Sequence, residues 1–174
     1  MRRRAQLLLS TVFITTSMVL AQQPATDHIA PVPAKLYTAK KIFLSNAGAD
    51  SGLFPHPFSG APDRGYNQLY AALQSSGQFT LVSDPEDADL VLQLELIEPN
   101  GPKYVDKTKG SSDPFPMFRL TIFDRGTHYI LWTFTESIEG AYLQKTHDRN
   151  FDDALKALMT DFKNLVSQKA GKPS

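Results

Sequence analysis

The amino-acid sequence predicts an α+β domain with the element order β-α-β-β-β-β-α, built on a five-stranded mixed or antiparallel sheet with two helices on one face. Three observations predict it. Apolar residues alternate along 88–98, alternate again on both sides of the turn at 124–127, and recur at helical spacing over 151–166. Because two helices cannot cover both faces of five strands, one face is expected to stay open.

The first half of the domain is expected to hold two short strands around one helix. Residues 41–45 form an apolar run bounded by Asn46 and Gly48, which is typical of a strand. Gly77 is placed to end the following helix, and residues 79–82 form the second strand. The helix has one apolar face, made of Tyr66, Leu69, Tyr70 and Leu73.

The second half is expected to hold three strands and the longer helix. The strongest strand covers 88–98, and a long loop rich in proline and glycine follows over 99–116. Residues 118–123 and 129–138 then predict a hairpin. Asn150 is a suitable N-cap for the last helix, whose apolar residues are Phe151, Leu155, Leu158, Phe162, Leu165 and Val166.

The alternation also predicts which side chains share a face of the sheet. We expect the helices to cover Leu90, Leu92, Leu94, Phe118, Leu120, Ile122, Ile130, Trp132 and Phe134. The open face is expected to carry Gln93, Glu95, Arg119, Thr121, Thr133 and Thr135. The same parity places four apolar residues there, which makes them candidates for a binding interface: Val91, Ile97, Phe123 and Leu131.

The first 21 residues are typical of a secretory signal peptide. Arg2, Arg3 and Arg4 precede an apolar run from Leu7 to Leu20, and Ala21 is a small residue at the expected cleavage site. That run is shorter than the roughly 20 residues that span a bilayer. We therefore expect a signal peptide over 1–21, a linker over 22–39, one domain over 40–167 and a disordered tail over 168–174. The predicted location is the periplasm or the secreted fraction.

Composition excludes several classes of function. The chain has no cysteine, which rules out disulfides, thiolate zinc sites, thiol nucleophiles and a lipid anchor on cysteine. Lysine plus arginine and aspartate plus glutamate are equal in number. Loss of the signal peptide would therefore leave a net negative protein, and no long basic run remains. Nucleic acid and anionic lipid are poor candidate partners, because both require clustered positive charge.

Two groups of polar residues could carry chemistry. His147-Asp148 could be half of a Ser-His-Asp triad, although no G-x-S-x-G motif supplies the serine. The acidic cluster 84–89 could hold a cation or supply a carboxylate pair, although capping of a turn explains Asp84 without a ligand. No metal site, cofactor site or catalytic residue is predicted.

Aromatic residues in the first long loop are a further candidate interface. Phe54 and Phe58 flank Pro55-His56-Pro57 within a loop over 46–65. Loops of this length are usually functional or disordered. The two rings either form part of a binding surface or fold back onto the core.

Three segments resemble a known group of bacterial domains. They are Phe79-Thr80-Leu81-Val82, Ala88-Asp89-Leu90-Val91-Leu92 and Ile130-Leu131-Trp132-Thr133. Their order over roughly 40–166 resembles the TolB amino-terminal domain and the periplasmic parts of curli-secretion-type lipoproteins. The resemblance implies an α+β envelope domain that binds other proteins and has no cofactor. The chain departs from the lipoproteins in lacking their anchoring cysteine, and no site residue carries over.

The sequence therefore predicts a non-enzymatic, exported binding or envelope-assembly domain. Its partner would be an unidentified envelope protein or a second copy of the chain. The alternative is a cell-envelope hydrolase that uses His147 or the acidic cluster 84–89. A third possibility is a small-ligand binder that uses the loop aromatics.

Overall fold

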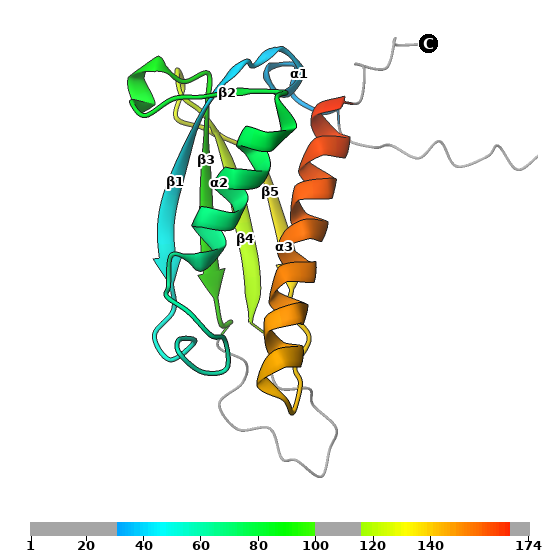
Figure 1. Ribbon diagram of the computed structural model, residues 1–174. Helices are drawn as coiled ribbons and strands as arrows, with labels where there is room; N and C mark the ends of the chain where they lie inside the picture. The colour runs from blue at the N-terminus through cyan, green and yellow to red at the C-terminus, as the bar shows by residue number, and fades with distance from the viewer. Residues whose placement is uncertain (1–30, 100–115, 168–174) are drawn as a thin grey trace, which may run out of the picture. The chain divides into compact units, whose positions relative to one another are not determined.

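Five strands form one mixed sheet in the order β2-β1-β3-β4-β5 in the computed structural model, which describes residues 31–99 and 116–167 (Figure 1). Strand β1 runs parallel to β2 and β3, and β4 runs antiparallel to β3 and β5. The predicted α+β class is thus confirmed. The elements are α1 (Lys35–Thr38), β1 (Lys41–Ala49), α2 (Arg64–Ser76), β2 (Thr80–Leu81), the 3-10 helix η1 (Pro85–Asp87), β3 (Leu90–Ile97), β4 (Met117–Asp124), β5 (Ile130–Ser137) and α3 (Gln144–Ser167).

The two long helices lie side by side on one face of the sheet (Figure 1). Helix α2 packs on β1, β2 and β3, whereas α3 packs on β4 and β5. Gly65 lets α2 approach the sheet closely, because a Cβ atom there would lie 2.9 Å from Cε1 of Phe118. Gly77 ends α2 in a left-handed conformation with φ 61°, as predicted.

The core lies between the helices and the sheet. Burial alternates strictly along β3, where Leu90, Leu92, Leu94 and Leu96 are all buried. The apolar stripe predicted for the last helix is buried in full, from Phe151 to Val166. These two patterns place the core where the spacing of apolar residues predicted it.

The prediction for the end of the hairpin was wrong at Ile130. The pairing of β4 with β5 shifts between Ile122 and Phe123, so that Ile122 pairs with Trp132 but Phe123 pairs with Ile130. This bulge moves Ile130 to the open face, where it is 60% exposed. Trp132 and Phe134 remain on the helix side but are only half-buried, because β5 is an edge strand.

Helix α3 begins two turns before the position that its apolar stripe suggested. Asn150 is not an N-cap: it lies inside the helix, and its side chain donates to the backbone oxygen of Glu139 at 2.9 Å. Gln144 instead starts the helix and donates to the backbone oxygen of Pro57 at 2.6 Å. A contact with a distant loop thus extends the helix beyond its apolar residues.

Packing begins earlier in the chain than the expected boundary at residue 40. Helix α1 lies inside the range 22–39, which the sequence assigned to a linker, and Leu36 and Ala39 are buried in the core. The sequence pattern does not reveal this helix, because four residues are too few to show helical periodicity. The expected signal peptide and C-terminal tail lie outside the described residues.

Candidate functional site

The sheet face opposite the helices carries an apolar group at one end. Val91 in β3 pairs directly with Phe123 in β4, and both side chains are half-buried. Directly paired residues in antiparallel strands project on the same side, so these two side chains are neighbours. Ile130 is the β5 partner of Phe123, and the half-buried Leu131 follows it. Two of the four predicted sheet-face residues, Val91 and Phe123, are therefore brought together by adjacent strands. The prediction was wrong for Leu131, because the register shift in β5 takes it out of the alternation and it packs against the buried core.

Ile97 lies at the other end of the face. It pairs with Met117, about 20 Å from Val91 along β3 at 3.3 Å per residue. An ion pair separates the two ends: Glu95 accepts from Nη2 of Arg119 at 2.6 Å and from its Nε at 2.8 Å. The open face thus has two apolar regions with a charged pair between them, and Ile97 does not belong to the Val91 group.

A shallow open hollow of about 580 Å³ surrounds Val91 and Phe123. Its lining combines the apolar side chains of Val91 and Phe123 with polar and charged side chains. Protein–protein interfaces likewise combine apolar residues with polar ones. The lining residues are Pro85, Glu86, Val91, Gln93, Phe123, Asp124, Arg125 and His128.

The loop aromatics belong to the core rather than to this surface. Phe58 is 1% exposed and its ring centroid lies 5.2 Å from that of Phe151 in α3. Phe54 is half-buried and lies 6.1 Å from the same ring, edge to face. A residue as buried as Phe58 cannot contact a partner, so it is removed from the candidate interface. Packing of this kind has no local signature in a loop rich in proline.

The acidic cluster 84–89 is held in structural hydrogen bonds. Asp84 caps η1 by accepting from the backbone N–H of Glu86 at 2.8 Å. Asp89 accepts from the backbone N–H groups of Lys40 and Lys41 at 2.8 and 2.9 Å, and these bonds lower its pKa. Within residues 31–99 and 116–167, no group of three or more histidine, aspartate or glutamate side chains could hold a metal ion.

His147 and Asp148 are not arranged as a catalytic pair. The His147 ring packs edge-on against Phe58, with centroids 6.2 Å apart, and makes no hydrogen bond to any residue that the structure describes. Asp148 accepts instead from the backbone N–H of Ser59 at 2.9 Å and from Nη1 of Arg64 at 2.6 Å. The hydrolase alternative therefore gains no support from this region.

Arg64 is the polar residue that sequence reasoning missed. Its second nitrogen donates to Asp152 at 2.7 Å, and its guanidinium lies 4.4 Å above the ring of Phe151. Asp148 and Asp152 stand one helical turn apart on α3, a spacing that presents two carboxylates on one face. The spacing of the two carboxylates is visible in the sequence. Their cationic partner, Arg64, lies more than eighty positions away and is not predicted by it.

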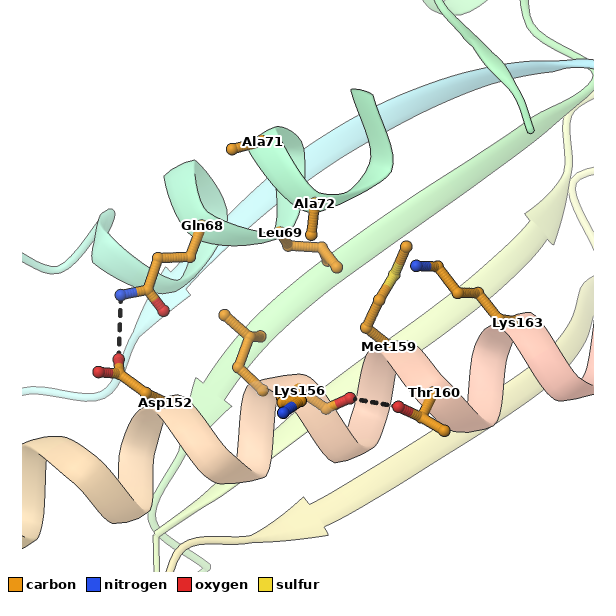
Figure 2. Close-up of a pocket in the computed structure, with 10 residues that line it drawn as sticks. Gln68, Leu69, Ala71, Ala72, Asp152, Lys156, Met159, Thr160 and Lys163 are labelled. Carbon is orange, nitrogen blue, oxygen red and sulfur yellow. Dashed lines mark hydrogen bonds between the residues drawn. The ribbon is translucent and has the colours of Figure 1, made fainter. Parts of the chain in front are cut away.

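A second hollow, between α2 and α3, is a weaker candidate for binding (Figure 2). It has a volume of about 530 Å³, with Lys156 and Lys163 among its lining residues. Its three large apolar lining residues are already buried, with exposed fractions of 0% for Leu69, 6% for Leu155 and 5% for Met159. An occupant would therefore remove little further apolar surface from water.

Comparison with known proteins gives similarity at the level of fold only. No family model and no curated protein matches the sequence. The chain is similar to a solved DUF4136 family protein from Bacteroides thetaiotaomicron, with 16% identity, a TM-score of 0.49 and coverage of 78% of this chain and 93% of that one. The chain is also similar to a protein from Xanthomonas campestris described by the family model DUF330, with 14% identity and a TM-score of 0.45. That match covers 78% of this chain and 90% of the other. The match to TolB from Acinetobacter baumannii has 15% identity and a TM-score of 0.33, and it covers 75% of this chain and 30% of TolB.

These similarities assign neither a family nor a function, because identities below a fifth and TM-scores below 0.5 show only a shared arrangement of elements. No helix in the described ranges is both long and apolar enough to span a membrane.

Proposed function

We propose that this chain is a non-enzymatic, exported binding domain of the bacterial cell envelope, and that it binds a partner protein through the open face of its sheet. One observation carries the proposal. The hollow around Val91 and Phe123 is lined by apolar and charged side chains together, on the face of the sheet that neither long helix covers in the described part of the chain.

Burial explains why this surface is favoured over the others. Val91 and Phe123 are only half-buried, so a partner can still remove apolar surface from water there. Ile130 and Tyr129 extend the same end of the sheet and are 60% and 75% exposed. Contiguous exposed apolar groups of this kind usually mark an interaction site.

The sequence supports the location. The arginine-rich head, the short apolar run and Ala21 are typical of an exported protein. The absence of cysteine fits a chain that needs no disulfide in an oxidising compartment.

The test is the substitution Phe123→Asp. A carboxylate in the centre of the hollow is expected to abolish binding, because a contact there would have to bury an unpaired charge. Binding is measured by chemical crosslinking in intact cells of the native host and, for self-association, by sedimentation velocity of the purified chain. Thermal unfolding shows whether the variant is folded.

Thr80→Asp is the matched control. Thr80 pairs with Lys41 at the far edge of the same face and is exposed, so the added charge is equal but lies away from the hollow. The control should retain the crosslinked species that Phe123→Asp loses. Undiminished binding by Phe123→Asp, or unfolding of the domain by this change, would contradict the proposal.

A further inference from the structure

The two edges of the sheet differ in how well they are protected. Strand β2 is two residues long, and shortness is one of the ways in which proteins protect an edge. Strand β5 forms the other edge and has eight residues, none of them proline, glycine or lysine. No strand of the described residues pairs with its outer side.

Alternate residues of β5 direct their backbone groups to this unpaired edge. The backbone N–H of Ile138 donates to the oxygen of Pro116 at 2.7 Å, which shows that this position faces β4. Because hydrogen-bonding direction alternates along an antiparallel strand, Thr133 and Thr135 face outward. Their N–H and C=O groups can therefore pair with an added strand.

Exposed apolar side chains lie before and after this edge. Tyr129 and Ile130 stand at the start of β5, and Tyr142 and Leu143 stand between its end and α3. They account for four of the five large exposed hydrophobic residues in the described part of the chain. A strand laid along β5 would meet exposed apolar side chains at the start of β5.

The charge beside the edge selects the kind of occupant. Glu136, Glu139 and Asp153 line a hollow of about 320 Å³ between the end of β5 and α3. No lysine or arginine lines it, and none of the three acids forms an ion pair with a described residue. A basic segment is favoured here, because its positive charge complements the unpaired acids beside the edge.

We infer that the outer edge of β5 binds an extended, positively charged segment of a partner protein, which adds a sixth strand to the sheet. This inference rests on the proposed function as a protein-binding domain. The partner segment would be basic and extended, and it would bind at an edge that is separate from the Val91–Phe123 hollow.

The experiment titrates the purified chain with a capped peptide of alternating valine and lysine, and with its valine and glutamate counterpart. Amide NMR shifts and hydrogen exchange report the site. The lysine peptide should shift and protect the amides of Thr133 and Thr135, and the glutamate peptide should not. Absence of binding up to about 1 mM, equal binding of both peptides, or protection at another site overturns the inference.

Two variants separate the backbone contribution from the charge. Thr135→Pro removes one outward N–H and leaves the bonds to β4 in place, so binding of the lysine peptide should weaken about tenfold or more. Thr135→Val keeps both the N–H and the branched side chain and should bind as the native chain does. If the proline variant does not fold, the combined substitution of Glu136, Glu139 and Asp153 by lysine replaces it as the test. This change should weaken binding of the lysine peptide by a similar factor.

Controls distinguish this inference from the proposed function. Glu98→Lys makes one such charge reversal at an exposed site outside the acidic hollow and should leave peptide binding nearly unchanged. Phe123→Asp should abolish binding of the natural partner at the sheet face but leave the lysine peptide bound to β5. Unchanged peptide binding by both edge variants, or self-association through β5, overturns the inference.

Discussion

Asp148 connects the loop before α2 to the start of α3. Its carboxylate accepts from the backbone of Ser59 and from Arg64, and Gln144 lies within reach at 3.4 Å. Burial of this carboxylate raises its pKa, but the hydrogen bonds from Ser59 and Arg64 outweigh that effect and hold the pKa well below the ordinary value. The folded state therefore favours the ionised form, and Asp148 stabilises the domain where it is charged.

Replacing Asp148 by asparagine should lower the free energy of unfolding by about 1–3 kcal/mol near neutral pH, because bonds to a charged group are lost. The folded-state pKa is depressed, so the native advantage is complete above the unfolded value of about 3.9 and declines as the pH falls below it. Urea unfolding of both proteins at several pH values measures this difference.

Asp161→Asn is the control, because Asp161 is exposed on the same helix and forms no hydrogen bond through its side chain to the described residues. It should change stability by less than about 0.5 kcal/mol. A difference between native chain and Asp148→Asn that stays constant into strong acid would refute the role given to the carboxylate.

At the scale of elements, α3 and β5 illustrate how position in the sheet controls burial. Phe162 lies at the centre of the apolar stripe of α3, is fully buried and packs 5.6 Å from the ring of Phe79. Trp132 packs beneath the same helix but belongs to an edge strand and stays half-exposed. The two aromatic residues should therefore differ in their contribution to stability.

Phe162→Ala should cost about 3–5 kcal/mol, the range for removing a large buried side chain. Trp132→Ala should cost about 1–3 kcal/mol, since less of its surface leaves water on folding. Urea unfolding of the two variants measures both values. Equal losses, or fluorescence of the single tryptophan typical of a fully buried indole, would contradict the half-buried position of Trp132.

At the scale of the whole molecule, helices cover one side of the sheet and both proposed binding features belong to the other side or its edge (Figure 1). The hollow lies over β3 and β4, and the acidic edge belongs to β5 and the start of α3. A partner that contacts the open face can therefore also reach β5, because β4 and β5 are adjacent strands.

Export should remove the first 21 residues. The charged head, apolar run and Ala21 predict a mature amino terminus at Gln22, within a few residues. Intact-mass measurement of the protein from the native host tests this. Leu8→Arg together with Leu9→Arg interrupts the apolar run and should cause the precursor to accumulate. Full-length native chain in the cytoplasm would argue against export.

The sequence by itself determined the class of fold and most of its core. Strict alternation over β3 and helical spacing over α3 each report local burial, and both were correct because each element buries one continuous face. The open face with Val91 and Phe123 followed from the same parity. No comparable signal marked α1, which is only four residues long.

Only the tertiary structure decided which strand is an edge, where the register shifts and which distant groups meet. The bulge that exposes Ile130 depends on how β5 pairs with β4, and the exposure of Trp132 depends on having no neighbour beyond β5. Arg64 at the start of α2 meets two carboxylates of α3 that lie more than eighty residues away in the sequence. Periodicity describes the environment along one element, whereas edges, hollows and ion pairs arise between elements. The parity of the strands predicted Val91 and Phe123 on the open face, but the hollow around them and the unpaired edge of β5 became visible only in three dimensions.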